Sequence, residues 1–317
     1  MSRFQSIFAE RLASYVELRQ HLGFRFEGQQ AILHAFDRYV HEREYHGPLT
    51  ERLAHDFALS VADPSTTVPA RRYLVVRHFA EYLATYDSST PRLDPKAILR
   101  RRQQPPPFIF TDQELEALMD RATQFIRRHP VSNVALRTMI GLAASTGMRP
   151  GEVVRLDQAH VDLQTGILIV RRTKLNKDRL VPTHSTTLDA LRVYAAHREQ
   201  MPEAHRETAF FLNSRTHRYQ IANLDYLFRR LARSLDLRAR RGTTPTFRSL
   251  RHTFAVRRLI AWYRGGEDVQ ARLPALATYM GHVHYTSTAY YLTATAEMLS
   301  VAANRLYTTE LGHGQQT

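Results

Sequence analysis

Apolar residues in the first part of the chain recur at intervals of three and four, the spacing that places them on one face of an α-helix. Gly23, the Gly47-Pro48 pair and the Asp63-Pro64 pair interrupt this pattern, and glycine and proline typically separate helices. The pattern therefore predicts a small all-α module with helices over residues 4–22, 29–44, 51–60 and 69–85.

A turn-rich and then basic stretch follows this module. Arg100, Arg101 and Arg102 lead into three consecutive prolines at positions 105–107. A proline run forms an extended, semi-rigid spacer rather than a helix or a strand. Residues 87–107 are therefore predicted to link the helical module to a second domain.

The second domain begins with a clear helix signal and continues with a tightly specified turn. Thr111 and Glu114 have the spacing of a capping box. Further along, Gly147 is predicted to close one helix shortly before the next begins. Arg149 is thereby held in the turn between two helices, and Glu152 lies one turn into the second of them.

The one clear β pattern comes next. Residues 161–163 and 167–170 predict a hairpin, and residues 179–182 predict a third short strand. Lys174 is expected at the hairpin tip between the last two strands. The rest of the chain is predicted to be helical, over residues 185–200, 222–236, 247–264, 268–280, 285–293 and 297–308.

The overall composition favours a polyanionic partner. The 317 residues are enough for two domains, and 44 Lys and Arg against 30 Asp and Glu give a formal net charge of +14. A charge of this size is typical of proteins that bind nucleic acid. The absence of cysteine excludes disulfides and thiolate metal sites. Without a signal sequence or an apolar run of about 18 residues, the protein is expected in the bacterial cytoplasm, associated with the nucleoid.

Several residues near the C-terminal end suit phosphate chemistry. Arg248 and Arg251 are three positions apart, so on a helix they share one face. His282 follows the helix-ending Gly281, and Tyr291 comes nine positions later. Guanidinium groups bind phosphate oxygens, and a tyrosine can attack phosphorus to form a covalent ester. Such a set needs no metal, and the histidines show no spacing typical of metal ligands.

Short motifs in a fixed order make the chain similar to the tyrosine recombinase (phage integrase) family. Each motif alone is common, but the ordered set is specific, and it extends over residues 108–310. The residues that carry the resemblance are Thr146-Gly147-Met148-Arg149-Pro150-Gly151-Glu152, Thr173-Lys174, Arg179-Leu180-Val181-Pro182, Leu250-Arg251-His252-Thr253-Phe254-Ala255, Gly281-His282 and Tyr291.

The resemblance implies a fold that is mainly α-helical with a small three-stranded β-sheet. Residues 1–86 would form a helical core-binding (SAM-like) domain, residues 87–107 the linker, and residues 108–317 an integrase-type catalytic domain. The two domains would close on duplex DNA as a C-shaped clamp. The last helix would pack into a neighbouring protomer, as in the family, or onto its own subunit.

The resemblance also implies a reaction and a set of roles. The enzyme would cut and rejoin two DNA sites through a 3′-phosphotyrosyl intermediate and a four-way junction. Tyr290 is a rival nucleophile, but the spacing from His282 favours Tyr291. The implied roles are Tyr291 as nucleophile, Arg149 and Arg251 as clamps on the phosphate oxygens, Lys174 as the proton donor to the leaving 5′ oxygen, His282 as a donor to the phosphate, and Glu152 as a support for the site.

One position departs from the family pattern. A histidine usually stands three residues before the second arginine, and this chain has Arg248 there. Arginine is always protonated in proteins, so it cannot act as a base. We expect Arg248 to keep an electrostatic role, while proton removal from Tyr291 depends on other groups.

The expected partner is double-stranded DNA with inverted-repeat core sites, bound by a homotetramer with or without accessory proteins. No cofactor, metal or membrane is implied. The basic residues expected to bind the DNA backbone are Arg71, Arg72, Arg77, Arg100, Arg101 and Arg102. For Arg71, Arg72 and Arg77 the alternative is that they form a solvated helix face.

Two other functions remain open from the sequence. A related enzyme could relax DNA with the same tyrosine chemistry without exchanging two partners. A DNA-binding regulator could keep the fold and have lost catalysis, and Arg248 is the residue that favours it. The sequence leaves open the target site and the choice between integration, excision, transposition and resolution, with a mobile-element enzyme preferred.

Overall fold

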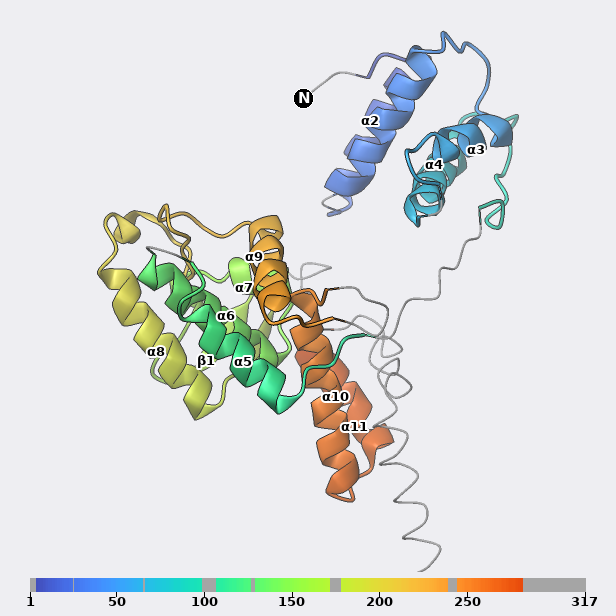
Figure 1. Ribbon diagram of the computed structural model, residues 1–317. Coiled ribbons are helices and arrows are strands. Elements are labelled where there is room, and N and C mark those ends of the chain that lie inside the picture. Colours follow the sequence, from blue (N-terminus) through green and yellow to red (C-terminus); the bar gives the residue numbers. More distant parts are fainter. Residues whose placement is uncertain are drawn as a thin grey trace, which may run out of the picture. The chain divides into compact units, whose positions relative to one another are not determined.

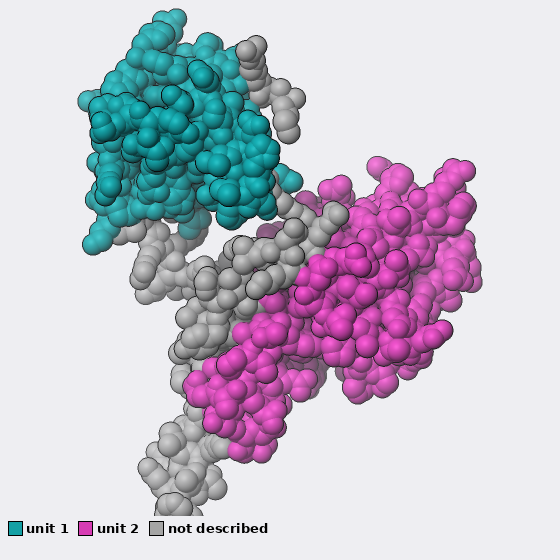
Figure 2. Space-filling view, turned by 180° about the vertical axis from the view of Figure 1, so that it is seen from behind, with its two compact units in different colours: residues 1–104 teal, residues 105–317 magenta. Residues whose placement is uncertain are grey.

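The computed structural model describes residues 4–24, 26–64, 66–98, 107–126, 129–171, 178–238 and 244–281. The chain divides into two units, unit 1 with residues 1–104 and unit 2 with residues 105–317 (Figure 2). Within the described ranges, every helix is too short or too polar to cross a membrane.

Unit 1 is built from helices that pack around a core of aromatic side chains. Phe36, Phe57 and Phe79 are fully buried, and the Phe36 and Phe57 rings meet edge to face at 5.1 Å. Phe79 contacts Tyr15 of the first helix. The elements agree with the predicted helices to within a few residues and are α1 (Ala9–His21), α2 (Glu27–His41), α3 (Glu51–Leu59) and α4 (Val68–Leu83) (Figure 1).

The predicted linker over residues 87–107 stays a prediction. Leu93, inside that range, is 4% exposed and belongs to the core of unit 1. At the other end, Phe108 and Phe110 pack with the core of unit 2. Residues 99–106, which hold the basic segment, lie outside the described part of the chain.

Unit 2 is mainly helical, and α6 lies at its centre in contact with α5, α8 and α10 (Figure 1). The capping box at the start of α5 is confirmed, because Thr111 Oγ1 accepts from the Glu114 amide and the Glu114 carboxylate accepts from the Thr111 amide. The helices are α5 (Asp112–Ala122), α6 (Pro130–Thr146), α7 (Pro150–Val154), η1 (Gln158–His160), α8 (Ser185–Glu199), η2 (Ala204–Arg206), α9 (Ile221–Ser234), α10 (Arg248–Arg264) and α11 (Val269–Met280).

The sheet has two strands among the described residues, where three were expected. Strands β1 (Ile167–Val170) and β2 (Arg179–Pro182) are antiparallel, with Val170 opposite Arg179. Val161 pairs with Leu168 in a single bridge, so the first expected strand does not extend. The reason is local: the Asp162 carboxylate accepts from the amides of residues 164 and 165, which turns the chain at once.

Helices α10 and α11 lie side by side in unit 2 (Figure 1) and share a small core that includes Leu259, Leu273 and Met280. Gly281 ends α11 in the left-handed conformation, with a φ of 67°. The two helices predicted over residues 285–293 and 297–308 lie outside the described residues.

Candidate active site

The turn predicted around Arg149 is present and fixes the backbone of that residue. Gly147 ends α6 with a φ of 65°, and Arg149 is the residue before the first turn of α7. The Arg149 amide donates to Glu152 Oε2 at 2.9 Å. Glu152 therefore holds the start of α7 and, at the same time, faces the Arg149 side chain.

The Glu152 carboxylate is the centre of a buried ionic cluster. The residue is 3% exposed, and both of its oxygens accept from guanidinium groups. Arg149 Nη1 donates to Oε1 at 2.8 Å, while Arg179 donates to Oε1 at 3.0 Å and to Oε2 at 2.8 Å. Burial acts to raise the pKa of Glu152, but the hydrogen bonds and charge of Arg179 and then of Arg149 outweigh it and lower the pKa to about 2.

Arg179 is a site residue that the sequence analysis missed, because it was placed in a strand and in one of the family motifs but was given no role. A signal was available in the alternation of side chains along that strand. Arg179 and Val181 lie on the same face of β2, and Val181 is fully buried. An arginine on a core-facing position needs an acceptor, and Glu152 provides it.

Arg251 joins the same cluster from α10. It is 2% exposed and donates to the Gly147 carbonyl at 2.6 Å and to the Met280 carbonyl at 2.9 Å. Arg149 donates to the Met280 carbonyl as well, at 3.4 Å. The two arginines that the sequence places 102 positions apart are thus brought to one acceptor, while their predicted role as clamps on a phosphate stays a prediction.

Three arginines from three separate elements therefore cap the C-terminal end of α11, and we call Arg149, Arg179 and Arg251 the arginine cap. The last carbonyls of a helix have no partner within the helix and form its negative end, so guanidinium groups are favoured there. The shortest contacts are Tyr279 O with Arg179 Nε at 2.9 Å, Met280 O with Arg251 Nη2 at 2.9 Å, and Gly281 O with Arg149 Nη2 at 2.7 Å.

Gly281 allows this arrangement for two reasons. Its positive φ is rarely adopted by residues with a side chain. A Cβ atom at this position would also lie 2.9 Å from Arg179 Nη1 and 3.4 Å from Arg149 Nη1. The end of α11 can approach the arginine cap this closely only with glycine there.

Arg248 and His252 lie beside the arginine cap on α10. Arg248 is the first residue of α10 and its side chain is exposed, unlike that of Arg251 one turn later. His252 is partly buried, and burial, together with the charges of Arg248 and Arg251, lowers its pKa to about 4. His252 is therefore neutral near neutral pH and adds no further positive charge to the cluster.

Other predicted site residues lie outside the described part of the chain. These are Lys174, His282, Tyr291 and the arginines of the basic segment, Arg100, Arg101 and Arg102. Their roles stay predictions. Gly281, which immediately precedes His282 in the sequence, is the last described residue and contacts Arg149.

The predicted DNA-binding arginines of unit 1 differ in how firmly they are held. Arg71 is exposed on α4. Arg72 stacks on the Phe57 ring at 3.9 Å and donates to the Ser60 carbonyl at 2.7 Å. Arg77 forms an ion pair with Glu81 at 3.7 Å, with 20% of its side chain exposed. Arg71 is the most accessible of the three to a phosphate.

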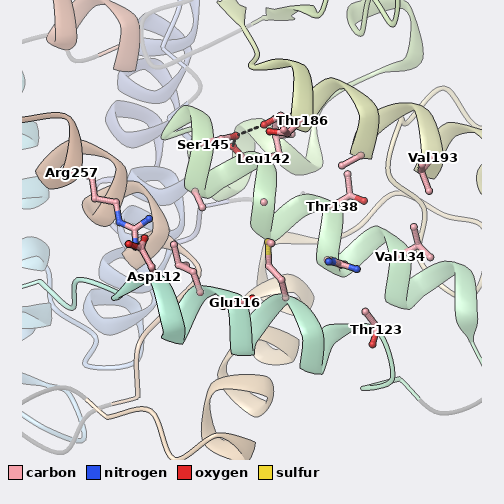
Figure 3. A pocket seen from close by; sticks show the side chains of 17 residues that line it. Asp112, Glu116, Thr123, Val134, Thr138, Leu142, Ser145, Thr186, Val193 and Arg257 are labelled. Carbon is pink, nitrogen blue, oxygen red and sulfur yellow. Dashed lines mark hydrogen bonds and ion pairs between the residues drawn. The ribbon is translucent and has the colours of Figure 1, made fainter. Parts of the chain in front are cut away.

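Unit 2 also contains a hollow of about 720 Å³, whose lining side chains are drawn in Figure 3. It lies between α5, α6 and α8, and Met119 and Leu142 are among the apolar side chains that line it. At one end Arg257 and Asp112 form an ion pair at 2.7 Å. No arginine-cap residue lines the hollow, and no group of His, Cys, Asp or Glu within the described ranges has the geometry to hold a metal ion.

Comparison with known proteins agrees with the ordered motifs. The model of a family described as the phage integrase family matches residues 109–298. The chain is similar to y4rE of Sinorhizobium fredii, an inferred integrase/recombinase, with 42% identity over 97% of this chain and 98% of the relative. Other relatives carry the name tyrosine recombinase.

Solved structures show the same fold at low sequence identity. A XerH site-specific recombinase bound to palindromic difH substrate, in a post-cleavage complex, aligns with a TM-score of 0.65 and 17% identity, over 87% of this chain and 78% of that one. The Tn1549 transposon integrase in complex with transposon right end DNA aligns with a TM-score of 0.61 and 17% identity, over 94% and 99% of the two chains.

Proposed function

The chain belongs to the phage integrase family of tyrosine recombinases, which break and rejoin DNA strands, and from this premise we propose that Tyr291 is the nucleophile of site-specific recombination. The Tyr291 oxygen loses its proton and attacks the scissile phosphorus. The bond from phosphorus to the 5′ oxygen breaks, and that oxygen takes up a proton. The products are a 3′-phosphotyrosyl link and a free 5′-hydroxyl, and the reverse attack by a 5′-hydroxyl rejoins the strand without ATP.

The observation that carries this proposal is the convergence of Arg149 and Arg251 on the Met280 carbonyl, immediately before Gly281-His282 in the sequence. Attack on a phosphodiester increases the negative charge on the phosphate oxygens. Donors that are already oriented stabilise this charge without reorganising. Arg149 keeps 31% of its side chain exposed and approaches the phosphate from the open side, whereas Arg251 acts from the buried side.

The remaining roles follow the motif positions. Lys174 protonates the leaving 5′ oxygen, and His282 donates to a non-bridging oxygen. Arg248 contributes positive charge at the exposed edge of the same helix as Arg251. The reference pKa of tyrosine is about 10, so positive neighbours favour the ionised form of Tyr291 that attacks.

The assembly on DNA is also part of the proposal. Four protomers bind two sites with inverted-repeat arms and exchange strands through a four-way junction. The palindromic substrate named for the XerH structure supports inverted repeats, and the transposon integrase among the solved structures supports a mobile-element role. Arg71 and the basic segment before residue 105 bind the DNA backbone without reading bases.

A trapping experiment with a randomised substrate tests the nucleophile, whatever the target site is. The probe is a pool of 5′-labelled duplexes with randomised inverted-repeat arms, each nicked near its centre so that the cut fragment diffuses away. The full chain is incubated with the pool, and covalent adducts are separated on a denaturing gel and sequenced. The variants are Tyr291→Phe, the matched control Tyr290→Phe, and Arg149→Ala.

We expect the unaltered chain and Tyr290→Phe to form a covalent adduct that carries the 5′ label. Tyr291→Phe and Arg149→Ala should form no labelled adduct. Loss of the adduct in Tyr290→Phe instead would assign the nucleophile to the neighbouring residue. A chain that binds the pool and forms no adduct is a regulator, which overturns the proposal. Relaxation of a supercoiled plasmid that lacks every selected site would point instead to a DNA-relaxing enzyme.

A further inference from the structure

Every side-chain nitrogen of Arg179 has an acceptor within the protein. Its Nε donates to the Tyr279 carbonyl, and its two Nη atoms form a parallel pair of hydrogen bonds with the two oxygens of Glu152. Such a two-point pair is the strongest and most directional contact that arginine makes with a carboxylate. The side chain is 12% exposed. All three nitrogen atoms are thus engaged within the protein.

Arg149 meets the same carboxylate in a different way. It makes one contact from its side chain, between Nη1 and Glu152 Oε1 at 2.8 Å, and its Nη2 points to the Gly281 carbonyl instead. One carboxylate carries one negative charge, and the two-point pair with Arg179 balances it. The positive charge of Arg149 therefore stays available to a further anion.

From this difference we propose that Arg179 is a positioning residue that neutralises Glu152, so that Arg149 stays oriented toward α11 and keeps its charge for the scissile phosphate. The proposal rests on the proposed function. Arg179 itself is not a catalytic residue, because its two-point pair with the Glu152 carboxylate already balances its charge.

The consequence of removing Arg179 follows from the same contacts. A buried carboxylate without a full partner attracts the nearest cation strongly, because the surroundings screen charge poorly. The nearest other guanidinium is that of Arg149, at 2.8 Å. In an Arg179→Gln variant, Arg149 would turn toward Glu152 as its two-point partner and leave the Gly281 carbonyl. A displacement of about 1 Å at a reacting centre lowers a rate by about 10²-fold.

This reasoning predicts a specific rescue. In the double variant Glu152→Gln with Arg179→Gln, two amides replace the ion pair, and no buried charge competes for Arg149. Arg149 is then free to serve the phosphate although Arg179 is absent. A role limited to holding the fold predicts the opposite, because the double variant has lost more of the ionic cluster than either single variant.

The test measures single-turnover cleavage of the nicked duplex at saturating DNA, with the Kd for the same duplex and the melting temperature measured in parallel. The variants are Arg179→Gln, Arg179→Lys and the double variant, each in the full chain. Arg206→Gln is the matched control, because Arg206 pairs with Glu203 at 3.0 Å in the same unit with 70% of its side chain exposed.

We expect Arg179→Gln to lower the cleavage rate by about 10²-fold, with the Kd within about threefold of the unaltered chain. Arg179→Lys keeps the charge without the two-point geometry and should lose less. The double variant should recover at least about tenfold over Arg179→Gln. Arg206→Gln should cleave normally.

Two results would overturn this role. One is an Arg179→Gln rate equal to that of the unaltered chain, and the other is a double variant as slow as, or slower than, the single one. If Arg179→Gln alone does not fold, the cleavage rates of the double variant and of Arg179→Lys test the role of Arg179 instead, since neither variant leaves Glu152 as an unpaired charge. Failure of the proposed function is recognised separately, because then the unaltered chain forms no Tyr291-dependent adduct.

Discussion

The arginines around the end of α11 and those on α4 are held in different ways. The arginine cap is bound to buried acceptors: Glu152 is 3% exposed, and Arg251 is 2% exposed. On α4, by contrast, Arg71 is exposed, and the ion pair of Arg77 with Glu81 reaches the surface. The direction of the arginine cap is fixed by the fold. On α4, Arg72 is held by Phe57 and Ser60, whereas Arg71 is exposed and retains freedom that a bound ligand would restrict.

This difference separates two contributions to a reaction on DNA. Donors fixed in advance lower the barrier, because they need no reorganisation as charge develops. Mobile surface cations add affinity by displacing counterions, and that affinity depends on salt. Substitutions in the arginine cap should therefore change rate constants, and substitutions on α4 should change affinity.

The largest effect is expected for Arg251→Ala. The cleavage rate at saturating DNA should fall by about 10³–10⁵-fold, the range for an arginine that acts on a phosphoryl transition state. Arg248→Ala, on the exposed side of the same helix, is the matched comparison and should lose less. Single-turnover kinetics with melting curves measure both variants. Equal losses from the two positions would remove the distinction between fixed and mobile cations.

The next effect concerns the free energy of unfolding at acid pH. The pKa of Glu152 falls from 4.5 to about 2 on folding, so its ionised form stabilises the fold above pH 4.5. That stabilisation, about 3 kcal/mol, is lost as the pH falls from 4.5 toward 2. Urea unfolding of the unaltered chain should show this fall in the free energy of unfolding across the pH range. In Glu152→Gln the part of the fall that is due to the Glu152 carboxylate should be absent. Parallel pH profiles would contradict the assignment.

A smaller effect is expected at the glycine that ends α11. Gly281→Ala imposes a left-handed backbone on a residue with a Cβ, and that Cβ meets Arg179. The expected loss of unfolding free energy is about 1–3 kcal/mol, with slower cleavage because the arginine cap shifts. Gly266→Ala is the matched control, because Gly266 has a φ of 74° and a Cβ there would meet nothing within 4 Å. It should share the backbone strain and keep the cleavage rate.

The smallest effect is expected on α4. Arg71→Gln should weaken DNA binding by a few-fold across all sequences and reduce the slope of log affinity against log salt by about 1. Cleavage at saturating DNA should be unchanged. Fluorescence anisotropy at several salt concentrations measures the slope. An unchanged slope would show that Arg71 belongs to a solvated helix face, the alternative left open by the sequence.

The parts of the fold that local chemistry determines were predictable from the sequence. The helices of unit 1, the capping box at Thr111 and the turn that holds Arg149 depend on residues close together in the chain. The strand predicted over residues 161–163 is reduced to one bridge, between Val161 and Leu168, because the Asp162 carboxylate holds a tight turn that begins at that residue. Hydrophobic alternation alone does not reveal such a side-chain cap.

The candidate site was predictable only in part. Ordered motifs identified Arg149 and Arg251, and the structure brings both to Met280. The partner of Glu152 was missed, since nothing in the local pattern connects Arg179 with a carboxylate 27 positions away. That link depends on how β2 packs against α7 and α11, and tertiary packing of this kind is not encoded in residue spacing.

The shared Met280 carbonyl has a consequence for the integrity of the site. Arg149 and Arg251 reach this one peptide group from positions 102 residues apart in the sequence. Pro274 already deprives α11 of one backbone donor, and helix ends fray more readily than helix interiors. Unwinding of the final turn would remove the shared acceptor from both guanidinium groups in a single event. One short-lived local opening would therefore release the orientation of both arginines.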